Sequence, residues 1–385
     1  MKQVPPFPAL GGLLLSTAVL VLASTAARAQ DNDSLLNYTF ANGATLTSYG
    51  QINEAWLNFD DGQEQRDFAP VANANSSNRL GMLIENEIND ASSVNFRAEL
   101  QYMPRPSNQV NFSDPYVDDY ALEKTDIRHL EVWYENESFG NFWGGQGKMA
   151  SDDISEIDLS GTHVVARSAI PDTAGAFYFR ETDGTLSGIQ IKKAYSNLDG
   201  SRRMRVRYDT PTFAGFTFSA AYGQDVLVED DDNDYFDAAL RYDFTNDSIK
   251  LQSGVGYNWV EAPDGGNSTA FFSGSASALH VPTGLNATIA GGTRVDQDGD
   301  FWYGKLGVIR DFLSIGSTAI SVDYGYGNQF AGNDGQFDSW SIEAVQRWKR
   351  TSMEFYAMYR LHEFGDDNAD YDDGAAWFAG ARWKF

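Results

Sequence analysis

The last ten residues of the chain, 376–385, read AWFAGARWKF and alternate between two kinds of side chain. One set is aromatic or small: Trp377, Ala379, Ala381, Trp383 and Phe385. The other set ends in two cations, Arg382 and Lys384. Successive side chains of a β-strand point to opposite faces. The stretch therefore predicts a strand with one face suited to lipid and the other suited to water.

The same alternation recurs along the chain, at residues 94–102, 235–244, 249–259 and 353–362. Each of these segments is apolar on one side only. A soluble sandwich also alternates, but here the polar side carries Arg, Lys and Glu, for example Arg97, Lys250 and Glu354. Charged side chains on the second face favour a water-filled lumen over a dry core.

The composition agrees with a barrel. The chain has no cysteine, so disulfides do not hold it together. Aromatic residues make up 14% of the chain, yet the mean hydropathy is −0.40. Beyond the N-terminal segment there is no apolar run long enough for a spanning helix. Because every backbone polar group must be paired in lipid, such a chain crosses a membrane only as a closed barrel.

The N-terminal segment has the features of a signal peptide. Lys2 precedes an apolar stretch, residues 10–23, and Ala27-Arg28-Ala29 is an A-x-A cleavage site. A membrane anchor is the alternative, but the stretch falls short of the ~20 residues that a spanning helix needs. We therefore predict a signal peptide at 1–29 and a barrel at 30–385. The loss of Lys2 and Arg28 takes the net charge from −26 to −28.

The alternating segments number about sixteen, an even count that leaves both termini on the periplasmic side. They are 45–60, 78–88, 93–103, 126–136, 140–148, 202–210, 215–224, 234–244, 249–261, 270–281, 286–295, 301–310, 317–329, 337–349, 351–363 and 375–385. The turns at 89–91, 245–247 and 350 are short, whereas the loops at 229–234 and 365–373 are long and acidic. Residues 188–195 suggest a further pairing with no evident partner.

One connection, residues 149–201, is longer than a surface hairpin requires. It is hydrophobic at 174–179, which argues against a simple solvated excursion. It also contains a run of carboxylates: Asp152, Asp153, Glu156 and Asp158. Clustered carboxylate oxygens suit calcium, so a calcium-binding run is one interpretation of these residues.

Several motifs together resemble the Gram-negative general porins. They are Tyr49-Gly50, Asn78-Arg79-Leu80-Gly81, Gly140-Asn141-Phe142-Trp143-Gly144-Gly145-Gln146, Val206-Arg207-Tyr208-Asp209-Thr210-Pro211 and the terminal Trp383-Lys384-Phe385. The resemblance implies an all-β transmembrane antiparallel barrel in the outer membrane, a homotrimer, and a third loop folded into the lumen as the constriction. It also implies that Trp383 and Phe385 form the signal through which the barrel-assembly machinery recognises the last strand. The usual Pro-Glu-Phe-Gly-Gly signature is missing and the loop is longer, so the resemblance does not fix the position of the constriction.

The basic side of a constriction can be read from one strand. Arg203, Arg205 and Arg207 alternate with apolar residues, so three guanidiniums project from one face at a spacing of roughly 6.6 Å. Arg79 and Arg128 lie where the resemblance places wall arginines, and alternation puts Arg97 on the lumen face. The alternative is that these cations only solvate a polar wall or pair with neighbouring carboxylates. Carboxylates of the loop opposite them would create a transverse field across the pore.

These observations predict a channel for passive diffusion of ions and small hydrophilic solutes, with a mild cation preference. A substrate-selective porin is the main alternative, since Phe177, Tyr178 and Phe179 could form a stacking track for sugars or else anchor the loop. A structural or adhesive barrel is a further alternative. The four histidines are scattered without an organised nucleophile or metal-ligand pairing, so we expect no enzyme activity, no resident cofactor and no metal centre.

The charge also bears on partners. A net charge of −26 repels phosphate, so nucleic acid is not an expected partner. The acidic loops suit divalent cations that bridge to lipopolysaccharide, and outer-membrane lipid is the other expected partner.

Overall fold

The structure is a computed structural model, and it describes residues 36–117, 120–263, 266–295, 297–332 and 334–385. The predicted signal peptide, 1–29, and the first residues of the predicted mature chain lie outside these ranges. No helix in the described ranges is long and apolar enough to cross a membrane.

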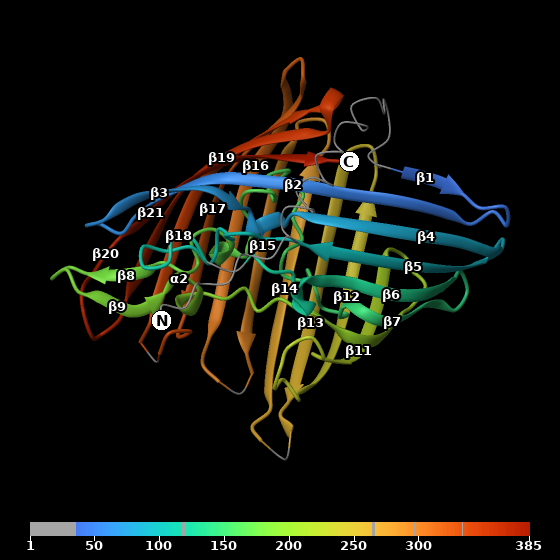
Figure 1. Cartoon of the computed structure of the whole chain (residues 1–385), viewed down its shortest axis with the longest axis horizontal. Coiled ribbons are helices and arrows are strands. Elements are labelled where there is room, and N and C mark those ends of the chain that lie inside the picture. The colour runs from blue at the N-terminus through green and yellow to red at the C-terminus, as the bar shows by residue number, and fades with distance from the viewer. Residues whose placement is uncertain (1–35, 118–119, 264–265, 296, 333) are drawn as a thin grey trace, which may run out of the picture.

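Within the described residues, sixteen antiparallel strands close into one barrel (Figure 1). They are β2 (Thr45–Asp60), β4 (Arg79–Asn89), β5 (Ser92–Gln101), β6 (Ile127–Asn136), β7 (Gly140–Lys148), β10 (Arg202–Asp209), β11 (Phe216–Gln224), β12 (Asp234–Thr245), β13 (Ile249–Glu261), β14 (Thr269–His280), β15 (Leu285–Arg294), β16 (Asp300–Leu313), β17 (Gly316–Asn328), β18 (Gln336–Trp348), β19 (Met353–Gly365) and β21 (Gly374–Lys384). The prediction of about sixteen strands is confirmed.

The barrel closes where the last strand meets the first. β21 pairs with β19 on one side and with β2 on the other, with Trp383 opposite Ile52. Phe385 donates its backbone N–H to the carbonyl of Gly50 and accepts the N–H of Gly50 in return, at 3.1 and 2.8 Å. A Cβ on Gly50 would lie 2.5 Å from the ring of Phe385. Only glycine therefore lets the terminal ring cover the seam.

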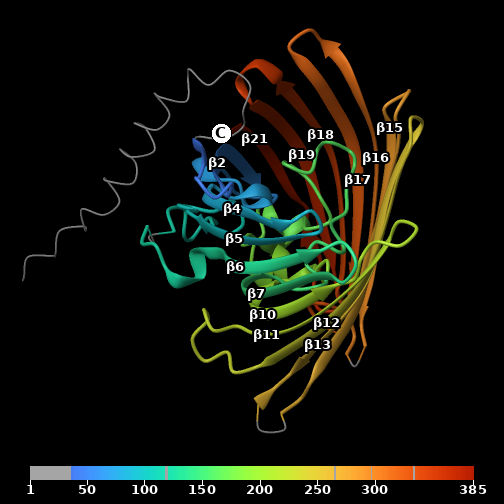
Figure 2. The same ribbon diagram turned by 90° about the vertical axis from the view of Figure 1, so that its right-hand side faces the viewer.

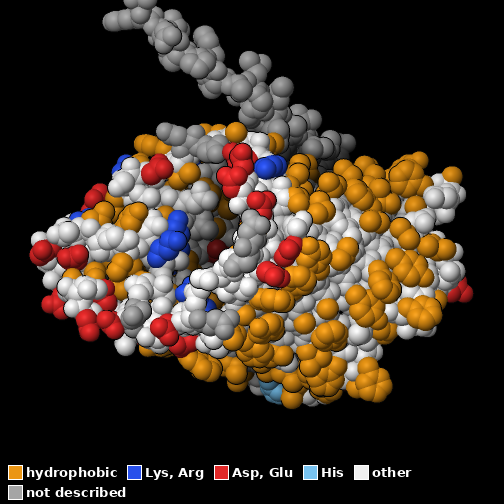
Figure 3. Space-filling view, turned by 90° about the horizontal axis from the view of Figure 1, so that it is seen from below, with side chains coloured by type: hydrophobic (Ala, Val, Ile, Leu, Met, Phe, Trp, Pro, Cys, Tyr) orange, Lys and Arg blue, Asp and Glu red, His pale blue; other side chains and the backbone are white. Residues whose placement is uncertain are grey.

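The strands differ in length around the barrel. β4–β7, β10 and β11 contain 8–11 residues, close to the 9–11 that a spanning strand needs. β12–β19 contain 10–14 residues and form the taller side of the barrel (Figure 2). The outer surface carries a broad field of hydrophobic side chains, and acidic side chains gather at one end of the molecule (Figure 3).

Two short strands extend the sheet at β2. β1 (Leu36–Thr39) pairs with the start of β2, and β3 (Gln65–Ala72) folds back along its second half. Short 3-10 helices lie in the connections, at Ala74–Ser76, Lys124–Asp126, Ile170–Asp172 and Lys349–Thr351.

The segment 149–201 packs against the inner wall of the barrel. Its apolar residues join inward-facing residues of the wall in one hydrophobic cluster, in which Phe177 stacks on Phe59 with ring centroids 4.0 Å apart. The segment also contains β8 (Tyr178–Glu181), β9 (Leu186–Gln190) and the short helix α2 (Ile191–Ala194). β8 pairs with β9 and with β20 (Tyr371–Asp372) of the last long loop, forming a small separate sheet. The pairing that the sequence suggested at 188–195 belongs to this sheet and to α2.

Candidate pore constriction

Polar side chains of the inner wall hold the long segment along the barrel. Each contact joins the segment to inward-facing positions of β12, β13, β14 or β17 at 2.6–3.1 Å. The contacts are Ser151 Oγ with Asp237 Oδ2 and Asn258 Oδ1, Ile157 N–H with Ser275 Oγ, Leu159 N–H with Ser277 Oγ, and Thr162 Oγ1 with Ser321 Oγ. The segment is therefore seated on the wall from β12 to β17.

Lys305 of β16 is a second fixing point. Its ammonium donates to Asp158 Oδ2 at 2.8 Å, to Thr162 Oγ1 at 3.1 Å and to the carbonyl of Ala166 at 2.7 Å. The carboxylate of Glu343 lies 3.5 Å away. The Lys305 side chain is fully buried, so its charge is balanced by these groups and not by water. One wall cation thus joins three residues of the segment.

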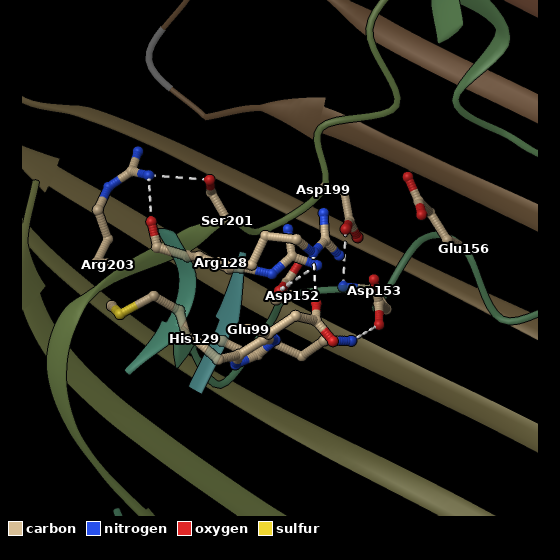
Figure 4. A network of polar contacts seen from close by, with 12 residues as sticks. Glu99, Arg128, His129, Asp152, Asp153, Glu156, Asp199, Ser201 and Arg203 are labelled. Carbon is tan, nitrogen blue, oxygen red and sulfur yellow. Dashed lines mark hydrogen bonds and ion pairs between the residues drawn. The ribbon is translucent and has the colours of Figure 1, made fainter. Parts of the chain in front are cut away.

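The four carboxylates predicted to face the basic wall separate into two pairs. Asp152 lies 3.7 Å from Arg202, and Asp153 pairs with Lys148 (Figure 4). Glu156 instead pairs with Arg167 of the same segment, and Asp158 pairs with Lys305 behind it. Of the four predicted residues, Glu156 and Asp158 therefore secure the segment, whereas Asp152 and Asp153 meet the cations at its edge.

The electrostatics of the acidic run follow from these partners. Burial opposes ionisation of Asp152, but Arg202 and Lys148 outweigh it and hold its pKa below the ordinary value. Burial and then the carboxylates of Glu156 and Asp152 raise the pKa of Asp199 well above its ordinary value. Asp199 caps the run, because its carboxylate accepts the N–H groups of Asp153 and Ser155 at 2.7 and 2.9 Å.

Carboxylate oxygens of Asp152, Asp153 and Asp199 lie within 4.8 Å of one another. The calcium interpretation stays a prediction, and these carboxylates already have partners within the protein. Asp199 uses both oxygens to cap backbone amides, and the other two carboxylates face Arg202 and Lys148. A bound cation would therefore share these carboxylates with Arg202 and Lys148.

The predicted wall arginines occupy different environments. Arg79 donates to Gln51 at 3.2 Å, and Arg128 donates to Glu99 at 2.7 Å. Strict alternation would put Arg128 on the outer face with Leu130. A register shift between Glu99 and Leu100 leaves Arg128 without an opposite residue in β5, and its side chain reaches the inward-facing Glu99.

The arginine stripe of β10 does not act as a unit. Arg205 is buried and, like Arg97, pairs with Glu131, so these two cations stabilise the wall. Arg203 pairs with Asp225 at 3.2 Å and lies over the ring of Tyr235. Arg207 pairs with Asp209 at 2.7 Å and also lines the two polar cavities described below. All three arginines of the stripe therefore pair with nearby carboxylates, as in the alternative interpretation.

Several charged residues at the constriction were not among the predicted wall cations. Lys148 and Arg202 are the cations that meet Asp153 and Asp152, and Arg241 donates to the carbonyls of Ala150 and Asp152. Arg382 of β21 bonds to Glu354 at 2.6 Å. Alternation would have placed Arg241 and Arg382 in the lumen, but Lys148 and Arg202 lie at strand ends, where alternation gives no direction.

Two polar cavities lie along the inner wall, one beside the segment and one at the short-turn end of the barrel. A cavity of about 300 Å³ is lined by both edge carboxylates and by Lys148, Arg207 and Arg241. A cavity of about 780 Å³ lies at the short-turn end of the barrel, and we name it the vestibule. Its charged residues are Glu87, Asp90, Glu135, Glu137, Asp209, Asp243, Arg207 and Arg241. Six carboxylates thus face two guanidiniums.

The aromatic residues of the segment do not line a track. Phe177 and Phe179 are buried, and Phe179 stacks on Phe364 at 5.2 Å. Tyr178 is partly exposed. Of the two roles that the sequence allowed, the packing of both phenylalanines favours anchoring.

Comparison with known proteins gives a family and a fold. Residues 16–368 match the family model of Gram-negative porins. No curated protein matches the chain. Among solved structures, the chain is similar to an anion-selective porin from Comamonas acidovorans, with a TM-score of 0.58 and 15% identity, over 89% of this chain and 100% of that one. It is also similar to OmpT of Vibrio cholerae, with a TM-score of 0.55 and 12% identity, over 91% and 100% of the two chains. A third similar structure is OmpF of Salmonella typhi in complex with daunomycin, with a TM-score of 0.55 and 14% identity, over 91% of this chain and 100% of that one. At these identities the structural likeness concerns the fold alone.

Proposed function

We propose that the protein passes ions and small hydrophilic solutes by passive diffusion, with a mild cation preference. The chain belongs to the Gram-negative porin family, so it is an outer-membrane channel and not an enzyme. The observation that carries the cation preference is the charge of the vestibule. Six carboxylates and two guanidiniums leave a net charge near −4 at one mouth of the pore. A negative mouth raises the local concentration of cations.

The constriction itself is mixed in charge. Lys148 and Arg202 face Asp153 and Asp152 across the edge of the segment, so neither sign dominates there. The vestibule and the acidic loops at the other end therefore set the preference of the whole path. The mature net charge of −28 acts in the same direction.

We also propose that the protein forms a homotrimer. One solved OmpT structure from Vibrio cholerae, 13% identical, is described as a trimer form. The short strands β4–β6 present large exposed apolar residues on their outer face, among them Leu80, Leu100 and Leu130. This apolar face is compatible with either lipid or a neighbouring subunit. The burial of Phe177 and Phe179 argues against the stacking track of a sugar-selective channel.

The test of ion preference is the reversal potential of single channels in a planar bilayer with a salt gradient at low ionic strength. We expect the sign of cation preference for the wild-type protein. The triple variant Glu87→Gln, Glu135→Gln, Glu137→Gln should move the potential toward anions. Raising the salt to 1 M should shrink this difference, since the Debye length falls to about 3 Å. Anion preference in the wild type, or a triple variant with an unchanged potential, would contradict the proposal.

A further inference from the structure

The sheet of β8, β9 and β20 connects the constriction segment to two outer loops. Glu181 lies opposite Tyr371, and the N–H of Thr182 donates to the carbonyl of Asp370 at 2.9 Å. Figure 1 shows β8 and β9 beside β20 at one end of the barrel. A hairpin of the inner segment is thus paired with the loop between β19 and β21.

Arg180 ties the same hairpin to the first loop. Its guanidinium bonds to Asp61 Oδ2 through Nε at 2.8 Å and through a terminal nitrogen at 2.7 Å. The other terminal nitrogen donates to the carbonyl of Gly184 at 3.1 Å, inside the hairpin turn. Asp61 is 1% exposed and also accepts the N–H of Glu64 at 2.7 Å. One guanidinium therefore bonds to the hairpin and to the loop between β2 and β3.

The hairpin leads directly to the acidic edge of the constriction. After β9 the chain forms α2 and then the buried residues Tyr195 and Leu198. It next reaches Asp199, whose carboxylate caps the backbone at Asp153 and Ser155. Asn197 bonds to Glu156 at 2.9 Å on the way. A displacement of the hairpin would be carried through this buried stretch to the carboxylates at the pore.

We propose that Arg180 is a positioning residue for the constriction: by locking the β8–β9 hairpin to the outer loops, it fixes the acidic edge of segment 149–201 in the pore. This inference rests on the proposed channel function. Arg180 does not touch the permeation path at the Asp153 edge, so it acts through the hairpin. Release of the lock would let the edge fluctuate, and the current would fluctuate with it.

The first experiment compares single-channel currents of Arg180→Gln and Arg66→Gln. The second variant is the matched control, because Arg66 lies on β3 of the same loop, is exposed, and contacts the ring of Phe68. We expect the time spent in reduced-current states to rise about fivefold in Arg180→Gln, as the loss of one modest interaction would produce. Arg66→Gln should behave as the wild type, and Arg180→Lys should recover part of the steady current. A wild-type level of fluctuation in Arg180→Gln would overturn the inference.

The second experiment restores the lock by other means. The hydrogen bond of Thr182 to Asp370 makes Glu181 and Tyr371 the adjacent non-hydrogen-bonded pair, with Cα atoms about 4.5 Å apart, a separation that a disulfide spans. The chain has no cysteine, so Glu181→Cys with Tyr371→Cys adds a single thiol pair. In the Arg180→Gln background, oxidation should return the current to its steady level and reduction should abolish that recovery.

Two results of the second experiment count against the lock. Failure of the bond to form in the otherwise wild-type chain, measured by mass spectrometry, would show that the hairpin is not paired with β20. An oxidised channel that still fluctuates would show that the hairpin does not control the constriction. The proposed function fails separately, if the wild-type protein conducts no current at all.

Discussion

Replacement of Lys305 by methionine would remove the cation that joins three residues of the constriction segment to the wall. Methionine keeps most of the side-chain volume. However, it leaves Asp158 and Glu343, which lie 2.8 and 3.5 Å from the ammonium, without their shared cation. Both carboxylates are almost completely buried. Removing one partner of a buried ion pair costs about 3–5 kcal/mol.

This cost should appear as local opening of the segment. The N–H groups of Val165 and Ala166 both donate to the carbonyl of Thr162, beside the lysine contacts. A loss of about 3–5 kcal/mol corresponds to hydrogen exchange that is roughly 150 to 5,000 times faster, provided that opening limits exchange. Mass spectrometry of peptides from 160–170 measures it in the folded protein in detergent.

Two further variants make the result specific. Lys250→Met removes an exposed lysine of β13 and should leave exchange in 160–170 unchanged. Asp158→Asn added to Lys305→Met removes one of the two uncompensated charges and should recover part of the protection. If Lys305→Met exchanges at the rate of Lys250→Met, the Lys305 ammonium contributes nothing to holding the segment.

Two other results are expected. Acid should loosen the same segment. Burial opposes ionisation of Asp158, but Lys305 and Ser160 hold its pKa below the ordinary value. The contribution of Asp158 to the stability of the segment is therefore complete above the unfolded pKa of about 3.9 and is lost as the pH falls through the folded pKa. Exchange in 160–170, corrected for its intrinsic pH dependence, should therefore be constant above about pH 5 and rise below about pH 4, and an unchanged corrected rate at pH 3 would contradict this. Deletion of Phe385 should lower the amount of protein in the outer membrane, because the chain loses the ring that covers Gly50 and the last pairing of the seam; equal amounts of deleted and full-length protein in purified outer membranes would contradict this.

The barrel could be predicted from the sequence because its cause is local. Alternation decides which face of a strand meets lipid, and it repeats in every segment from 45–60 to 375–385. The seam at Phe385 and the inward direction of Arg79 and Arg97 follow from the same pattern. Arg128 does not follow this pattern, because one extra residue in β6 reverses the direction of its side chain.

The constriction was harder to predict because its contacts are distant in sequence. Asp158 meets Lys305, and Arg180 meets Asp61, across 147 and 119 residues. No periodicity of the loop indicates these partners. The carboxylates of 152–158 look alike as a run, yet folding divides them between the pore edge and the wall behind it. The acidic composition of the loop indicates that it pairs with cations, but it does not indicate which cations of the wall are the partners.

Thiol labelling during current recording tests whether segment 149–201 narrows a water-filled lumen. Ile157 lines the cavity of about 300 Å³ beside Asp152 and Asp153, whereas Val206 is exposed on the outer face of β10. The chain has no cysteine, so Ile157→Cys and Val206→Cys each carry one thiol. A charged methanethiosulfonate reagent should lower the current of Ile157→Cys in discrete steps, one for each pore, and leave that of Val206→Cys unchanged. A current that responds at Val206 and not at Ile157 would contradict the account.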